Sequence, residues 1–111
     1  GLAESRGLTT IMLANHGGDH AIYPDCRENF IKAITSAIKL GTGAQIDVFA
    51  PYTGITKDEI CRLGSKLGVE YEKTWSCYKG GDAHCGKCGT CMERKEAFDK
   101  AGVPDPTQYI N

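Results

Sequence analysis

Short apolar runs alternate along the chain with segments whose apolar residues recur at helical spacing. The runs "LTTIMLAN" at 8–15 and "QIDVFAP" at 45–51 are rich in β-branched and apolar residues, which favours buried strands. The segment "VEYEKTW" at 69–75 alternates apolar and polar positions and predicts a third, shorter strand. The hydrophobic pattern therefore predicts three strands, well separated along the sequence.

Helices are predicted between and after these strands. Apolar residues recur every three or four positions from Phe30 to Leu40. Thr56 with Glu59, and Thr90 with Glu93, have the spacing of a capping box, so we expect further helices to begin there. Glycine is the usual residue after a helix. The expected stops are Gly41, Gly68 and Gly102.

Strands that alternate with helices favour parallel pairing. The predicted class is therefore α/β, a three-layer arrangement in which helices flank a mostly parallel sheet. The 111 residues suit one domain. We expect an α/β part at 1–74, a cysteine segment with its helix at 75–103, and a loosely attached tail at 104–111. Ligands bind at the carboxyl edge of such sheets. The loops after the first two strands and the cysteine segment are therefore predicted to converge.

Charge and hydropathy narrow the partners. Thirteen basic and fourteen acidic residues leave a net charge of −1, which offers no long-range attraction to nucleic acid or anionic lipid. No run of about 18 apolar residues is long enough to span a membrane. We expect a soluble, cytoplasmic protein without membrane or direct nucleic-acid contacts. The opening "GLAESRG" has the pattern of a helix end, which suggests a piece of something longer.

Four of the six cysteines are crowded into fifteen residues with the spacing C-x7-C-x2-C-x2-C. Such clustering in a reducing compartment indicates metal more often than disulfides. Four thiolates close a tetrahedral zinc site, and neighbouring glycines let the chain turn tightly around the ion. The predicted zinc ligands are Cys77, Cys85, Cys88 and Cys91.

Three alternatives fit this cluster less well. An iron–sulfur run of the ferredoxin type continues with cysteine and proline, where this chain has Lys95 and Glu96. A thioredoxin-like site needs one isolated C-x-x-C pair. A nucleic-acid finger needs basic and aromatic side chains around the knuckle, whereas acidic residues here offset the basic ones. These residues are Lys79, Lys87, Arg94 and Lys95 against Asp82, Glu93 and Glu96.

Two further stretches carry candidate chemistry. "HGGDH" at 16–20 lacks the spacing of a phosphate loop, so we expect a flexible loop with solvated His16 and His20. In "YPDCRENF" at 23–30, Asp25 suits either a helix cap or a ligand acceptor. Arg27 suits either a carboxylate or phosphate ligand or an ordinary surface position. The residues alone leave both choices open.

"IYPDCRENFIKA" together with "WSCYKGGDAHCGKCGTCMERKEAF" resembles the 7-cyano-7-deazaguanine synthase family of the adenine-nucleotide alpha hydrolase superfamily. The resemblance runs from about Leu8 to Gly102 and covers only the C-terminal half of that enzyme. It implies an ATP-dependent ligase that converts 7-carboxy-7-deazaguanine and ammonia into the 7-cyano compound, a precursor of queuosine in transfer RNA. The family's S-G-G-x-D-S pyrophosphate loop and adenine-binding region are missing here, so we expect this chain alone to be inactive or weakly active.

The resemblance also implies roles for individual residues. It makes the four cysteines zinc ligands and places Lys57, with Pro51, beside the nucleotide. The implied substrate-binding residues are Asp19, Tyr23, Pro24, Asp25, Cys26 and Arg27. It assigns no catalytic residue and implies a homodimer. Ala21 and Ile22 differ from the serine and glycine of many members. A different reading of the same cysteines is a free-standing zinc module that binds a protein or nucleic acid.

Overall fold

The computed structural model describes residues 1–110, which form two compact units. We call residues 1–56 the N-unit and residues 57–110 the C-unit, and each is described by itself. Asn111, the last residue of the predicted tail, lies outside the described residues. No helix among residues 1–110 is long and apolar enough to cross a membrane.

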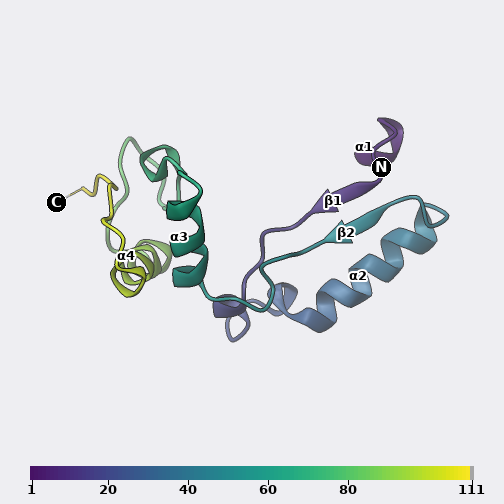
Figure 1. Cartoon of the computed structure of the whole chain (residues 1–111), viewed down its shortest axis with the longest axis horizontal. Coiled ribbons are helices and arrows are strands. Elements are labelled where there is room, and N and C mark those ends of the chain that lie inside the picture. The colour runs from purple at the N-terminus through teal and green to yellow at the C-terminus, as the bar shows by residue number, and fades with distance from the viewer. Residues whose placement is uncertain (111) are drawn as a thin grey trace. The chain divides into compact units, whose positions relative to one another are not determined.

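The N-unit is a strand–helix–strand unit (Figure 1). Its elements are α1 (Leu2–Ser5), β1 (Thr10–Met12), the 3-10 turns η1 (Gly17–Asp19) and η2 (Pro24–Cys26), α2 (Glu28–Gly41) and β2 (Asp47–Phe49). β1 and β2 pair in parallel, with Ile11 opposite Val48, and α2 packs along β2. The structure confirms the first two predicted strands, their parallel pairing and the helix between them. The ladder between the two strands is only three residues long.

Little of the N-unit is buried. The half-buried face of α2 carries Ile31, Ile34 and Ile38, at the spacing that the sequence predicts. Ile46, just before β2, is the single fully buried residue among residues 1–56, with 2% of its surface exposed. The sheet therefore has a helix on one side and much apolar surface in contact with solvent.

The C-unit is built on two helices that pack against each other, α3 (Lys57–Lys66) and α4 (Gly89–Ala101). Phe98 of α4 meets the ring of Tyr71 edge-on, with centroids 5.0 Å apart. The Tyr71 hydroxyl donates to the Cys61 carbonyl at 2.7 Å. A Cβ at Gly64 would clash with the Tyr71 hydroxyl oxygen, so only glycine lets this ring reach α3.

The predicted third strand is wrong. Tyr71–Lys73 is instead the 3-10 turn η3, and the described sheet has two strands rather than three. The amides of this segment bind locally: Val69 N–H donates to the Gly64 carbonyl at 2.9 Å, and Thr74 N–H to the Tyr71 carbonyl at 3.1 Å. The alternation in 69–75 reflects the inward Tyr71 side chain, not a pleat. The expected three-layer sheet is observed only as a two-stranded sheet with flanking helices.

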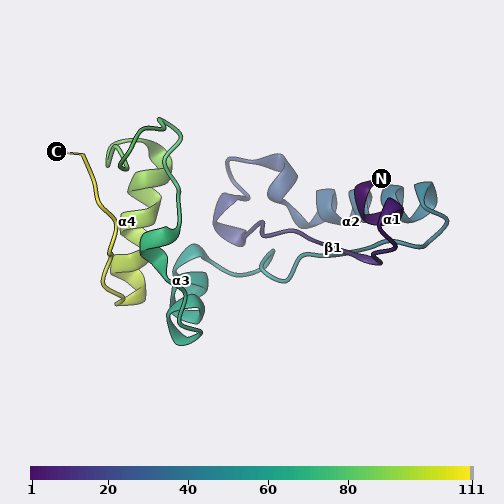
Figure 2. The same cartoon turned by 90° about the horizontal axis from the view of Figure 1, so that it is seen from above.

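Two details of the last helix also differ from prediction. α4 begins at Gly89 after Cys88, so Thr90 lies inside the helix and not at its cap. The tail is not loose, because it pairs with the cysteine segment: His84 N–H donates to the Gln108 carbonyl at 3.1 Å, and Ile110 N–H to the His84 carbonyl at 2.8 Å. The tail runs beside α4 (Figure 2). Gly102, in the left-handed conformation, ends α4 as predicted.

Candidate functional site

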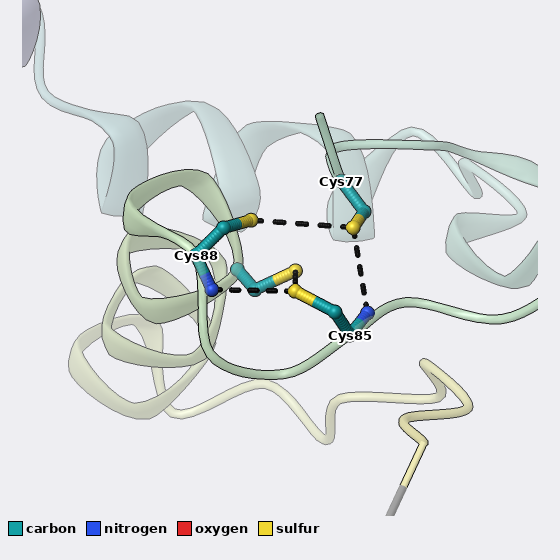
Figure 3. A group of neighbouring side chains, drawn as sticks. Cys77, Cys85 and Cys88 are labelled. Carbon is teal, nitrogen blue, oxygen red and sulfur yellow. Dashed lines mark hydrogen bonds between the residues drawn. The ribbon is translucent and has the colours of Figure 1, made fainter. Parts of the chain in front are cut away.

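Four of the five cysteines of the C-unit gather at one point (Figure 3); they are Cys77, Cys85, Cys88 and Cys91. Their sulfur atoms all lie within 4.8 Å of one another, and the pairs Cys85–Cys91 and Cys77–Cys88 are 4.0 Å apart. Sulfurs bound to one zinc ion at about 2.3 Å are spaced by roughly 3.8 Å. A disulfide would need about 2.05 Å, and all four cysteines are free. The geometry suits a tetrahedral metal ion, as the spacing predicts.

The local chain explains why the sulfurs converge. Cys85 and Cys88 flank a turn in which Gly86 has φ +69°, a conformation that other residues rarely adopt. The amides of Lys87 and Cys88 point at the Cys85 sulfur, at 3.5 and 3.3 Å. Cys85 N–H donates to the Cys77 sulfur at 3.4 Å. Such N–H donors stabilise negative charge on sulfur, so the backbone is arranged for thiolates.

The thiols differ in acidity, for identifiable reasons. The Thr90 hydroxyl, 3.3 Å from the Cys88 sulfur, and the Cys91 amide lower the pKa of Cys88 to about 5. The amide of Cys85 lowers the pKa of Cys77. Burial, followed by hydrogen bonding with Cys88, raises the pKa of Cys91 to about 12. Four thiolates this close repel one another without a cation, and a divalent metal ion supplies the compensating charge.

A buried arginine joins several segments of the C-unit. The Arg94 guanidinium donates to the Thr107 hydroxyl at 2.6 Å and to the Tyr71 carbonyl at 2.9 Å. It also donates to the hydroxyls of Thr74 and Ser76. Arg94 is 6% exposed. This side chain therefore holds α4, η3 and the tail together, a role that its charge in the sequence did not reveal.

Three aromatic rings, Trp75, His84 and Tyr109, follow one another beside Cys77 and the tail. Trp75 Nε1–H donates to the Cys77 carbonyl at 2.7 Å, and its ring lies 4.2 Å from that of His84. His84 is buried, and its Nε2 accepts from the Ser76 amide at 3.1 Å. Burial and then the Arg94 charge lower the pKa of His84, so the imidazole is neutral and serves as an acceptor.

In the N-unit, the loops that follow β1 and β2 meet. Gly17 N–H donates to the Ile55 carbonyl at 2.7 Å, and a Cβ on Gly17 would stand 3.1 Å from that oxygen. Asn15 Nδ2 donates to the Thr53 hydroxyl at 3.0 Å and to the Cys26 carbonyl at 3.2 Å. The convergence predicted for these two loops is confirmed. The cysteine segment was predicted to converge with these two loops, and that part stays a prediction.

The "HGGDH" loop is more ordered than expected. His16 Nε2 lies 3.1 Å from Asp19, and the His16 side chain is 12% exposed, so the expectation of solvated histidines is wrong for His16. The His20 carbonyl accepts from Arg27 Nε at 2.7 Å. The glycines let this loop fold back so that His16 contacts Asp19. The sequence shows only that the phosphate-loop spacing is missing and does not indicate this contact.

The predicted substrate loop forms η2 and the entry to α2. Pro24 opens η2. Arg27, not Asp25, occupies the cap position of α2, and its side chain makes no capping hydrogen bond to that helix. Tyr23, Asp25 and Arg27 are exposed to solvent. Burial, and then the charges of Asp19 and Asp25, raise the pKa of Cys26, which keeps this thiol protonated. No structural observation tests the substrate role of these residues.

A cleft of about 420 Å³ lies next to this loop within the N-unit. Glu28, Ile31 and Lys32 line it at the spacing of one helix face, opposite residues that follow β2. The full lining is His20, Glu28, Ile31, Lys32, Ala50, Thr53 and Gly54. Of these residues, the sequence singled out only His20, as a loop histidine and not as part of a cleft. The i, i+3, i+4 spacing after "YPDCR" was the available signal.

Lys57, the predicted nucleotide-binding residue, is the first residue of α3. Its Nζ lies 3.1 Å from a carboxylate oxygen of Glu93 on α4. It also lines a largely apolar pocket of about 170 Å³ with Arg94 and Phe98. Lys57 therefore has an anionic partner within its own unit, and its role toward a nucleotide stays a prediction.

Comparison with known proteins identifies the family. The family model described as "Queuosine biosynthesis protein QueC" matches residues 1–102. The chain is 62% identical over 109 residues to a 7-cyano-7-deazaguanine synthase from Porphyromonas gingivalis. It is 50% identical over 111 residues to proteins of the same name from Allorhizobium ampelinum and Brucella ovis. These matches cover 98% of the chain and 50%, 47% and 48% of the relatives, respectively.

The chain thus spans about half the length of the curated relatives it matches. Its tail from residue 103 lies beyond the part matched by the family model. The resemblance carried by the "YPDCR" and cysteine motifs is confirmed at the level of the family. The chain belongs to the QueC family of queuosine biosynthesis proteins.

Proposed function

We propose that this chain is the substrate-side and metal-bearing part of an ATP-dependent ligase that makes 7-cyano-7-deazaguanine from 7-carboxy-7-deazaguanine and ammonia. The observation that carries the proposal is the 62% identity to a 7-cyano-7-deazaguanine synthase over nearly the whole chain. A cytoplasmic location and a homodimer are part of the same proposal. In the whole protein, the β1–β2 pair belongs to a larger, mostly parallel sheet of the adenine-nucleotide alpha hydrolase type.

The exposed substrate loop is proposed to bind the deazaguanine acid. Arg27 Nε is engaged with the His20 carbonyl, which orients the guanidinium plane. The terminal nitrogens of this fork suit a carboxylate. The neighbouring residues Asp19, Tyr23, Pro24, Asp25 and Cys26 complete the proposed contact surface. Holding the acid in place lets its carboxylate oxygen attack ATP and release pyrophosphate, and ammonia then displaces AMP to form the amide. Activation of the amide oxygen by a second ATP, with release of pyrophosphate and then of AMP, forms the nitrile.

Lys57 is proposed to border the ATP phosphates. Because its Nζ contacts Glu93, a phosphate has to replace or share this ion pair. The half of the relatives that this chain does not match is proposed to supply the pyrophosphate loop and the adenine site, so the 111 residues alone are expected to be inactive. That division of labour explains why no residue of this chain is assigned to catalysis.

Zinc is the proposed metal, because four thiolates in a tetrahedral arrangement are its usual structural ligand set. When bound, it cross-links the segment after η3 to the start of α4 and leaves no coordination position for substrate. The alternative of a nucleic-acid finger is disfavoured by internal contacts. Arg94 is buried among hydroxyls and carbonyls, and the Lys95 ammonium binds the Gly86 carbonyl.

Calorimetric titration with 7-carboxy-7-deazaguanine tests the proposal. The zinc-loaded chain is titrated alone and with the N-terminal half of the Porphyromonas gingivalis relative added. We expect binding that strengthens when the added half and ATP are present, and that falls at least tenfold in Arg27→Ala. The matched control is Arg62→Ala, which removes an exposed arginine paired with Asp58 on α3. A folded sample that binds no acid in either mixture would refute the proposed function.

A further inference from the structure

The four-cysteine cluster is supported by a residue that is not one of its four proposed metal ligands. Lys95 of α4 donates from Nζ to the Gly86 carbonyl at 3.0 Å, in the middle of the Cys85–Cys88 turn. The same ammonium lies 4.3 Å from the centre of the Tyr109 ring, within the range of a cation–π interaction. Helix, turn and tail therefore meet at one lysine side chain.

The position of the Gly86 carbonyl matters because of peptide geometry. Gly86 C=O and Lys87 N–H belong to the same planar, trans peptide, so they point in opposite directions. Lys95 holds the oxygen on one side, and the N–H on the other side is 3.5 Å from the Cys85 sulfur. A peptide rotated at this point would turn the amide away from the sulfur and remove a donor that stabilises the thiolate.

The tail holds the lysine in place. The Tyr109 hydroxyl donates to the Asp105 carboxylate at 2.6 Å, and the residues on either side of Tyr109 pair with His84. The Tyr109 side chain also comes close to the turn, since a Cβ on Gly86 would lie 3.4 Å from its ring. These contacts fix the ring beneath the Lys95 ammonium. The tail that carries Tyr109 is outside the region that the family model matches.

We propose that Lys95 and Tyr109 are positioning residues of the metal centre: together they orient the Gly86–Lys87 peptide toward the Cys85 sulfur and so slow the loss of the bound metal. Neither side chain binds the ion. The inference rests on the metal site of the proposed function and adds a role for the tail. Residues that orient metal ligands in this indirect way typically change metal affinity by about 10- to 100-fold.

Zinc release into excess chromogenic chelator measures this role. Lys95→Met keeps the length of the side chain and removes the donor, and we expect zinc release about 10- to 100-fold faster than in the parent. Lys100→Met is the matched control: it removes the same charge from the same helix at a lysine paired with Glu96. Lys95→Arg retains a donor and a cation, so it is expected to release zinc within about threefold of the parent rate.

The tail is tested in the same assay. Tyr109→Ala removes the ring below the ammonium and is expected to speed release about tenfold. Tyr109→Phe keeps the ring, loses only the hydroxyl, and is expected to stay near the parent. Both residues act on one peptide. The double variant should therefore change the activation free energy of zinc release by less than the sum of the changes in Lys95→Met and Tyr109→Ala.

Amide hydrogen exchange separates positioning from a general loss of structure. In the zinc-loaded Lys95→Met variant, exchange at Lys87 and Cys88 is expected to quicken while amides at the centre of α3 keep the parent rate. Uniformly faster exchange across the C-unit, or equal zinc release from Lys95→Met and Lys100→Met, would overturn the inference. A parent protein that takes up no metal would instead overturn the proposed metal site, so the two failures are distinguishable.

Discussion

The two units bury their hydrophobic residues to very different extents. Ile46 is the one buried hydrophobic residue of the N-unit, whereas five in the C-unit are buried, with Phe98 and Cys91 at the centre. The C-unit also buries Arg94 and His84, and both find hydrogen-bond partners. The N-unit leaves Met12 and Phe49 of its paired strands 62% and 53% exposed.

The two units differ in how completely their own elements enclose their apolar residues. In the C-unit, α3, the Tyr71 ring of η3 and Thr107 of the tail all contact α4, so local elements complete a small core. In the N-unit, a two-stranded sheet with one flanking helix cannot enclose its own apolar surface. The N-unit is thus the part of the chain whose stability depends on further covering surface, and the C-unit is the part that a metal ion can stabilise by itself.

Replacing a cysteine of the cluster is expected to have the largest effect on the contrast in stability between the two units. Cys88→Ser is expected to lose the metal and unfold the C-unit, because structural zinc contributes on the order of 10 kcal/mol to the folding of small zinc domains. Trp75, the one tryptophan of the chain, reports this unit by fluorescence. The control is Cys26→Ser in the N-unit, which should retain one equivalent of metal. An unchanged Trp75 unfolding curve in Cys88→Ser would show that the cysteines are not structural.

Removing Arg94 tests whether the C-unit core depends on its buried polar network. Arg94→Met is expected to lower the free energy of unfolding by about 4 kcal/mol, since it leaves buried acceptors and the Asp105 carboxylate without their cation. Urea denaturation followed at Trp75 measures the loss. Arg62→Met, at the exposed pair with Asp58, should change stability by less than about 1 kcal/mol. Equal effects of the two substitutions would contradict the central role of Arg94.

The sparse core of the N-unit is tested by two apolar substitutions. Ile46→Ala is expected to cost about 3 kcal/mol, because it empties the single buried hydrophobic position among residues 1–56. Phe49→Ser, at an exposed strand position, should cost about 0.5 kcal/mol or less. Amide exchange of β1 and β2 in increasing urea gives both values. If Phe49→Ser proves the more damaging, this strand face is covered in the protein, and the contrast between the units is smaller than described.

The smallest expected effect concerns the tail at high pH. Burial, and then the hydrogen bond to Asp105, raise the pKa of Tyr109 from its ordinary value of 10.0 to about 12. The hydrogen bond is worth about 1 kcal/mol. A pKa raised on folding means that this stability is fully present below pH 10 and disappears as pH rises toward 12. Lys95, Arg94 and the His84 ring also surround this hydroxyl-bearing ring.

Unfolding of the parent and of Tyr109→Phe at pH 8 to 12 measures this dependence. The stability difference between them should remain constant to about pH 10 and vanish by about pH 12. The acid limit follows from Asp105: burial raises its pKa, but hydrogen bonds from Thr107 and Tyr109 outweigh burial and leave the pKa below its ordinary value of 3.8. The same stability is thus lost only as pH falls below that value. A difference that grows above pH 10 would contradict the assigned hydrogen bond.

Local sequence alone determined much of this protein. The apolar spacing of 30–40 predicted α2, the β-branched runs predicted β1 and β2, and the C-x7-C-x2-C-x2-C spacing predicted four converging sulfurs. These features depend on neighbouring residues, whose periodicity and turn chemistry are visible in one dimension. The motifs of residues 22–33 and 75–98 likewise carried the resemblance to the 7-cyano-7-deazaguanine synthase family, and the comparisons confirm that family.

Only the tertiary structure decided the rest. The segment around Tyr71 reads as a strand, yet it turns, because its ring packs on Phe98 of α4 and fits over Gly64 of α3. Arg94 and Lys95 read as surface cations, yet one is buried among hydroxyls and the other orients a peptide beside a thiolate. Each outcome depends on a contact between different elements of the C-unit. Local propensity is weak compared with the free energy of such contacts, so folding in three dimensions decides them.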